Sequence, residues 1–293
     1  MPPSDLAAAT RVAPIAHAPG WYTADLPDAW SYLTPSGGVL MTVAMRAMTA
    51  ELDDDDLHPV SASTVFMSRV PAGPLAVRVE VLRRGNAACQ VRAALSSTAT
   101  PEPGLEVSAT FARHRRGPDA MGRAMPDVPD PEQCNDAGDR SILADAKGNR
   151  PVRPFFENLD MRLAIGAPVW RRDWEAGEAR MAFWYRYRVP QRGAAGDLDP
   201  LAIPPIADTM PSALARRLGP DHPRFFAPSL DLTVHFLDRG RTDWYLVDVR
   251  CPRAREGYAT AHADVWDADG HLVAFAAQTM MLRQRPKKKL STS

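Results

Sequence analysis

Three side chains that can do hydrolytic chemistry follow one another in the stretch Pro228–Phe236. Hydrophobic residues alternate there with Ser229, Asp231 and His235, which is the pattern of a strand with one apolar and one polar face. A hydroxyl, a carboxylate and an imidazole are the groups of a serine hydrolase. Side chains spaced along one extended strand do not easily converge on a single hydroxyl, so we do not assign a catalytic triad to them.

A second candidate is the glycine pair Gly37-Gly38, which precedes the apolar segment Val39–Met48. If this segment is a helix, it is a buried one, because it is apolar nearly all round. Paired glycines at a helix start leave free N–H groups that can bind substrate or stabilise an oxyanion. A plain turn before a helix is the alternative. We expect the acidic run at residues 53–56 to be a solvated loop, because four consecutive side chains cannot converge on one ion.

Composition narrows the function classes. The chain has 293 residues, with 35 Lys and Arg against 35 Asp and Glu, which argues against a nucleic-acid partner. The three cysteines share no close spacing, so we predict no metal site, no cofactor and a reduced, cytoplasmic protein. We find no signal peptide pattern and no apolar run of membrane-spanning length, and so expect no membrane partner.

The stretch at residues 228–236 resembles an earlier one at residues 58–66. Each follows a helix-like segment and precedes three more strand-like segments, so the chain looks like one unit written twice. A buried helix wrapped by a long antiparallel sheet is the hotdog arrangement. We therefore predict an α+β double hotdog, with the two sheets joined edge to edge. The expected segments are an N-terminal hotdog (1–114), a linker (115–154), a C-terminal hotdog (155–285) and a disordered basic tail (286–293).

The elements of the second half position one further carboxylate. Residues 201–218 are helix-like and contain three prolines, so we expect the regular helix to begin only near Thr209, or to begin earlier and kink at Pro211. In both cases Asp208 lies at or near its N-terminal end. Asp267–Gly270 is a hairpin signal. The other expected strands are Val60–Val70, Leu75–Leu82, Ala87–Ser96, Leu105–Arg113, Glu157–Ile165, Glu178–Val189, Thr242–Cys251, Glu256–Asp267 and His271–Arg283.

Both halves resemble the TesB-like (type II) acyl-CoA thioesterases. In the first half the resemblance lies in Gly37-Gly38 and in the segments 58–66, 82–86 and 108–111. In the second half it lies in Asp208 and in the segments Pro228–Asp231, Asp267–Gly270 and Ala274–Gln278.

The resemblance implies a water-activating site. The family is similar in using an Asp, a Thr or Ser, and a Gln to hold a hydrolytic water, and these fall on Asp208, Ser229 and Gln278. A carboxylate can accept the proton of the water, while the other two groups orient it. We match Gln278 to Phe111 in the first half, which predicts one polar site per chain. Structural roles remain open for each residue: an N-cap for Asp208, a strand start for Ser229 and a polar core residue for Gln278.

The expected function is hydrolysis of acyl-CoA thioesters to free acid and CoA, in fatty acid metabolism, by a homo-oligomer (a dimer or a dimer of dimers). A catalytically silent hotdog protein that binds acyl-CoA or another apolar ligand is the alternative. A hotdog dehydratase or hydratase is disfavoured, because it would want a His paired with a carboxylate near a central helix and neither helix-like segment contains one.

Overall fold

The computed structural model describes residues 2–100, 102–137, 154–169, 173–193, 196–223 and 225–284. The predicted basic tail, residues 286–293, lies outside these residues. So do residues 138–153 of the predicted linker.

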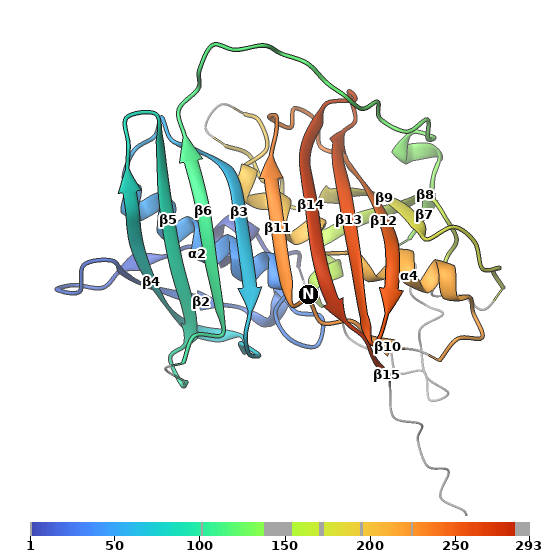
Figure 1. The fold of residues 1–293 in the computed structure, drawn as a ribbon, viewed down its shortest axis with the longest axis horizontal. Helices are drawn as coiled ribbons and strands as arrows, with labels where there is room; N and C mark the ends of the chain where they lie inside the picture. Colours follow the sequence, from blue (N-terminus) through green and yellow to red (C-terminus); the bar gives the residue numbers. More distant parts are fainter. Residues whose placement is uncertain are drawn as a thin grey trace, which may run out of the picture.

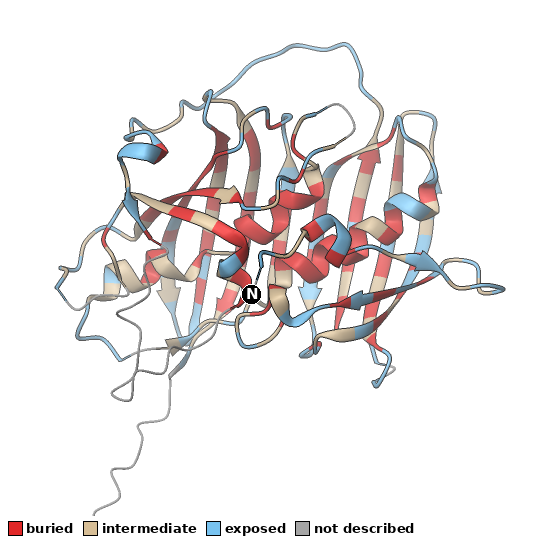
Figure 2. Cartoon of the chain, turned by 180° about the vertical axis from the view of Figure 1, so that it is seen from behind, coloured by how far each residue is buried: buried red, intermediate tan, exposed pale blue. Residues whose placement is uncertain are grey.

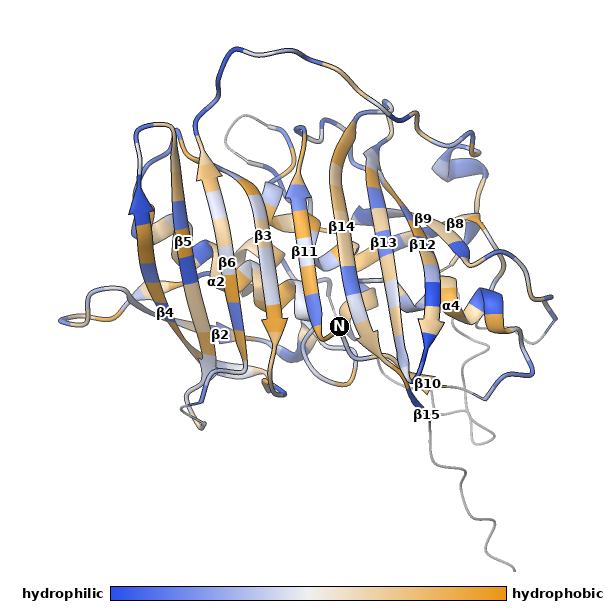
Figure 3. Cartoon of the chain, viewed as in Figure 1, coloured by the Kyte–Doolittle hydropathy of each residue, from blue (hydrophilic) through white to orange (hydrophobic). Residues whose placement is uncertain are grey.

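All but two of the described strands form one long antiparallel sheet (Figure 1). Each expected strand is present, with ends that differ by a few residues. Bands of hydrophobic and hydrophilic residues alternate along several strands in Figure 3, as expected for strands with one buried face. The sheet order is β1-β2-β4-β5-β6-β3-β11-β14-β13-β12-β9-β8-β7. The bounds are β1 Ala13–Pro14, β2 Trp21–Leu26, β3 His58–Phe66, β4 Gly73–Arg84, β5 Ala88–Ser97, β6 Leu105–Ala112, β7 Asn135–Asp136, β8 Leu159–Ile165, β9 Arg180–Tyr187, β11 Asp231–Phe236, β12 Tyr245–Arg255, β13 Tyr258–Asp267 and β14 Leu272–Met281.

A separate short pair, β10 (Phe225–Phe226) with β15 (Arg283–Gln284), lies outside that sheet. The helices are α1 (Leu6–Ala9), α2 (Gly37–Leu52), α3 (Ile203–Ala207) and α4 (Pro211–Leu218). Figure 2 shows helices lying across one face of the sheet, with most of their residues buried. We call this the helix-covered face and the opposite one the outer face. The predicted α+β double hotdog is confirmed.

The helix expected at residues 201–218 is broken in two. Asp208 follows the last residue of α3 and lies shortly before the first residue of α4, so it is near the N-terminal end of the second helix and not inside a continuous one. The prolines explain the break. Pro211 has no N–H to donate to a carbonyl in the preceding turn, and it can only open a new helix, which it does at the start of α4.

The two halves meet at β3 and β11, the two strands whose sequences resemble each other. They pair antiparallel, with Thr233 opposite Ser63. The hydroxyl groups of these two residues lie 2.9 Å apart. The predicted edge-to-edge joining of the two sheets is therefore confirmed, and neither β3 nor β11 is left as an unpaired edge.

A β-bulge at the start of β11 changes which residues face the helices. Thr233 pairs with Ala277, and Ser229 forms a bridge with Met280. The four-residue separation from Ser229 to Thr233 therefore matches the three-residue separation from Ala277 to Met280 on β14. The segment that leads into β11 thus carries one extra residue. The extra residue reverses the alternation, and Ser229 turns toward the helix-covered face. The prediction that Ser229 shares a face with Asp231 is wrong.

The first half repeats this bulge. Pro59 pairs with Phe111 and Ser61 pairs with Thr110, so β3 also carries one extra residue near its start. The register corrects one sequence match. Ser63 pairs with Ser108 as Thr233 pairs with Ala277, so the counterpart of Gln278 is Ala109 and not Phe111.

Candidate active site

Asp208 lies where the two halves touch, between α3 and α4. Its side chain is buried, with 8% of the residue exposed. Its Oδ2 atom accepts a hydrogen bond from the backbone N–H of Gly38 at 3.0 Å and one from the Ser36 hydroxyl at 3.4 Å. Both donors come from the start of α2 in the first half. Because the N-terminus of a helix carries partial positive charge, α2 stabilises this carboxylate as an anion.

Gly38 allows this contact because α2 and α3 approach each other closely there. A Cβ atom at position 38 would lie 2.2 Å from the carbonyl oxygen of Pro204 and 2.8 Å from the Cα of Pro205. Backbone atoms cannot make room in the way that a side chain can. A glycine is therefore required if the first turn of α2 is to present its N–H to Asp208.

Ser229 and Gln278 complete a connected polar set with Asp208. The Ser229 hydroxyl is 3.1 Å from Oδ1 of Asp208 and 3.3 Å from Oε1 of Gln278. Gln278 is 1% exposed, whereas Ser229 is half-buried. The Nε2 group of Gln278 is buried without a hydrogen-bond partner among the described residues. Buried amide groups normally have partners, so this donor is available to a water or ligand. The structure thus brings together the three side chains that the resemblance singled out.

Burial raises the pKa of Asp208 from 3.8 to about 6. Removing the carboxylate from water disfavours its charged form. The N–H groups of Gly38 and Gly37 and the hydroxyls of Ser229 and Ser36 act in the opposite direction, because they donate to the anion. The balance leaves a carboxylate that is ionised at neutral pH yet a stronger base than an exposed one.

The glycine pair predicted to bind substrate faces this carboxylate. The Gly38 N–H is engaged by Asp208, and the Gly37 N–H also favours the charged form of Asp208. Ser36, which the sequence reasoning missed, is the residue at the N-cap position of α2 and adds its hydroxyl to the same carboxylate. A serine just before a predicted helix is a recognised start signal, and it was the available clue.

The alternative set of Ser229, Asp231 and His235 does not converge. His235 is exposed on the outer face, and Asp231 accepts a hydrogen bond from the backbone N–H of Thr279 at 2.8 Å. Ser229 turns away from both, toward Asp208. This agrees with the expectation that residues along one strand do not form a triad.

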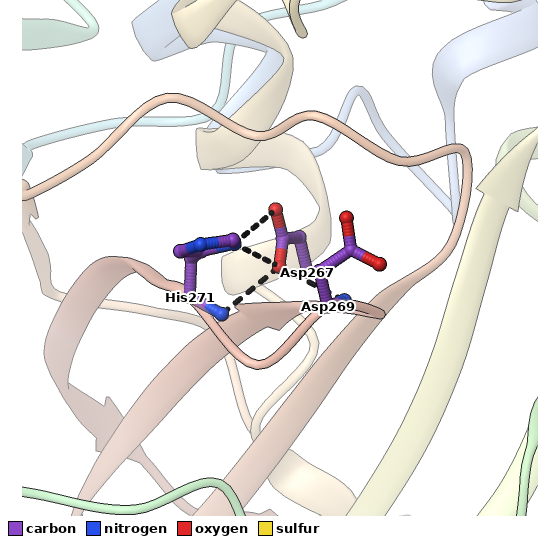
Figure 4. Close-up of side chains that lie close together, drawn as sticks. All are labelled: Asp267, Asp269 and His271. Atoms are coloured by element: carbon purple, nitrogen blue, oxygen red, sulfur yellow. Dashed lines mark hydrogen bonds and ion pairs between the residues drawn. The ribbon is translucent and has the colours of Figure 1, made fainter.

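Another carboxylate cluster, Asp267, Asp269 and His271, occupies the turn between β13 and β14 (Figure 4). Asp267 is fully buried. Its oxygens accept hydrogen bonds from the backbone N–H groups of Arg241, Asp269 and His271. The carboxylate is therefore used to hold the predicted hairpin, which is confirmed here, and the cluster by itself does not indicate a metal.

A cavity of about 650 Å³ lies on the outer face of the second half, away from Asp208. The segment at residues 123–127 lines one side of it, and Arg123 forms an ion pair with Asp264 there. On the opposite wall Arg180 holds Asp248 through two hydrogen bonds of 2.8 Å. Three arginines and three aspartates line the cavity, so the formal charges of its wall balance.

None of the helices in the described part of the chain has both the length and the apolar character that crossing a bilayer requires.

Comparison with known proteins places the chain in a family. A model of the acyl-CoA thioesterase N-terminal domain matches residues 26–112, and a model of the acyl-CoA thioesterase C-terminal domain matches residues 131–282. A search of curated proteins finds no match.

Several solved structures share the fold. A protein of unknown function with a hot dog fold from Alicyclobacillus acidocaldarius is 18% identical, with a TM-score of 0.78 over 96% of this chain and 98% of that one. The acyl-CoA thioesterase II TesB2 from Mycobacterium marinum is 21% identical, with a TM-score of 0.71 over 96% and 99%. A tesB protein from Mycobacterium avium subspecies paratuberculosis is 18% identical, with a TM-score of 0.73 over 96% and 99%.

At these identities the structures establish the fold, and the two domain models establish the family. Thioester hydrolysis is the chemistry to which that family points. The resemblance read from the sequence is confirmed: the chain belongs to the TesB-like acyl-CoA thioesterase family.

Proposed function

We propose that the protein hydrolyses acyl-CoA thioesters to the free acid and CoA with a water activated by Asp208. The observation that carries this proposal is the connected set at the junction of the halves. It combines a buried carboxylate with a pKa near neutrality, a hydroxyl in contact with it, and a buried amide donor with no partner among the described residues.

Asp208 is the general base in this mechanism. One Oδ1 lone pair accepts the Ser229 hydroxyl, which leaves the other for a water proton. Its raised pKa brings it closer to the operating pH, which increases its strength as a base while keeping it ionised. The donors from α2 hold the carboxylate in one orientation, so the Gly37 and Gly38 N–H groups position the base instead of contacting the thioester.

Gln278 and Ser229 orient the water. The free Nε2–H of Gln278 donates to the water oxygen, which leaves an oxygen lone pair for attack on the thioester carbon. The Ser229 hydroxyl fixes the Oδ1 atom that receives the proton. As the new C–O bond forms, a proton passes from the water to Asp208. The C–S bond then breaks, and the departing CoA thiolate takes that proton.

The test is release of CoA thiol from acyl-CoAs of graded chain length by the wild-type protein and by Asp208→Asn. Removing a general base lowers kcat by about 10²- to 10⁴-fold. Asp264→Asn is the matched control, because it removes a partly buried carboxylate from the outer face of the same half. It should leave kcat unchanged.

Two results would count against the proposal. Full turnover by a folded Asp208→Asn protein would exclude Asp208 as the base. A wild-type protein with no turnover on any acyl-CoA would exclude hydrolysis and favour the ligand-binding alternative, which a rise in Tm with added acyl-CoA would then reveal.

A further inference from the structure

The β-bulge that turns Ser229 toward Asp208 leaves one backbone group of β14 without its usual partner. Leu230 donates its N–H to the carbonyl of Thr279 at 2.8 Å, so that carbonyl points toward β11. In an antiparallel ladder the N–H and C=O of one residue point to the same side. The N–H of Thr279 therefore also points toward β11, at the place where the extra residue interrupts the ladder.

The carboxylate of Asp231 occupies that place. Its Oδ1 atom accepts the Thr279 N–H at 2.8 Å and so replaces the missing backbone acceptor. A hydrogen bond from a backbone N–H to a carboxylate is stronger than one between neutral groups. Without it, the Thr279 N–H would lose its protein acceptor at a partly buried position, which is unfavourable.

This bond joins the two segments that carry Ser229 and Gln278. Asp231 lies two residues after Ser229, and Thr279 follows Gln278 directly. We propose that Asp231 is a positioning residue for the hydrolysis: its bond to Thr279 fixes the bulge and thereby sets Ser229 and Gln278 at contact distance from each other. This rests on the proposed function, in which these two side chains orient the base and the water.

The first half supplies the comparison. Ser61 is the counterpart of Asp231, and it pairs with Thr110 directly in the β3–β6 ladder. The bulge of β3 therefore forms without a carboxylate. The residue at the position that corresponds to Ser229 is Pro59, which has no hydroxyl to orient. Of the two bulges, only the one in the second half contains a carboxylate. Because the fold forms the other bulge without one, a role in the site explains the carboxylate better than a general requirement of the fold.

The test compares Asp231→Ala, Asp231→Asn and Ser61→Ala with the wild type. Asp231→Ala should lower kcat about tenfold with KM within about twofold, since misplaced orienting groups affect the transition state more than substrate binding. Asp231→Asn keeps an Oδ1 acceptor and should restore most of kcat. Ser61→Ala should behave as wild type in both parameters.

Two readouts do not depend on activity. Hydrogen exchange at the Thr279 amide should accelerate in Asp231→Ala and not in Ser61→Ala. The titration midpoint of the Asp208 carboxyl, followed by NMR, should rise in Asp231→Ala, because the Ser229 hydroxyl that lowers it is displaced. Asp231→Asn, as the less disruptive variant, keeps both readouts close to wild type.

An active wild type whose kcat is unchanged in Asp231→Ala would overturn the inference. So would a Thr279 amide or an Asp208 midpoint that does not respond to Asp231→Ala, whether or not the protein is active. An inactive wild type would instead remove the proposed function, and the exchange and titration results would then decide alone whether Asp231 positions Ser229.

Discussion

The bulges at the starts of β3 and β11 have the same strand geometry and different contents. In the second half the bulge turns a serine toward the helix-covered face, beside Gln278 on β14. In the first half the same positions hold Pro59 and Ala109, which have no side-chain hydrogen-bonding group. The difference shows that the bulge belongs to the fold, whereas the polar set was placed on one copy of it.

The helices of the two halves also differ, and here each half contributes a different part of the polar set. The first half keeps one uninterrupted helix, α2, whose start supplies N–H donors and no ionisable side chain. The second half breaks its helix at Asp208, and the break presents the carboxylate to those donors. One half thus provides the N–H donors and the other provides the carboxylate, so a single half holds only part of this polar set.

Among the variants that remove a difference between the two halves, Gln278→Ala should have the largest effect on kcat. It removes the free amide donor, so kcat should fall on the order of 10²-fold through loss of water orientation. Ala109→Ser, at the counterpart in the first half, should leave kcat within about twofold. Steady-state thiol release measures both. A Gln278→Ala enzyme as fast as Ala109→Ser would mean that the two positions are functionally equivalent.

A smaller effect is expected from Ser229→Ala. Loss of one hydrogen bond to a charged group amounts to about 1.5 kcal/mol, or on the order of tenfold in kcat. Ser229→Thr keeps the hydroxyl and should remain close to wild type, and Pro59→Ala serves as the control in the first half. An equal loss in Ser229→Thr and Ser229→Ala would show that packing, and not the hydroxyl, matters at this position.

The pH dependence sharpens the comparison further. Because the base must be deprotonated, kcat/KM should fall about tenfold per pH unit below the Asp208 pKa of about 6 and level off above it. Ser229→Ala should move this midpoint to higher pH, since the hydroxyl lowers the pKa of Asp208, and Pro59→Ala should not. A pH profile that stays flat from about one unit below to about two units above that pKa would contradict Asp208 as the base.

The last expected effect is on stability and not on rate. Folding raises the pKa of Asp208 from 3.8 to about 6, so the folded protein holds this proton more tightly than the unfolded chain does. The group therefore lowers stability as the pH rises through that window, by at most about 3 kcal/mol. Denaturant unfolding of wild type and Asp208→Asn across the window isolates the contribution. A difference between the two proteins that does not change with pH would refute it.

The sequence predicted the repeated architecture because hydrophobic alternation and turn residues are local signals. The buried helix α2 could be recognised from its apolar residues alone. The bulge could not, because the alternation from Ser229 to Phe236 is unbroken in sequence. The phase reversal arises from pairing with β14, about fifty residues away in the chain. For the same reason the register, and not the sequence, identified Ala109 as the counterpart of Gln278.

The three site residues were found through the family resemblance, and their partners were not. The bond between the Gly38 N–H and Asp208 joins residues 170 positions apart. A glycine pair before a helix signals free N–H groups, but it does not specify what they bind. The position of the break at Asp208 could not be predicted from the three prolines of this segment. A proline can either end or kink a helix or begin a new one, and the sequence does not say which of these each proline does.

The distance in sequence between the parts of the site has a consequence for how the protein is made. Ser36 and Gly38 leave the ribosome long before Gln278, which lies on the last strand of the large sheet. The first half can form its own sheet during translation, but the carboxylate, the hydroxyl and the amide meet only after β14 has been synthesised. A chain truncated before residue 278 would therefore carry the α2 donors, Asp208 and Ser229 without the Gln278 amide.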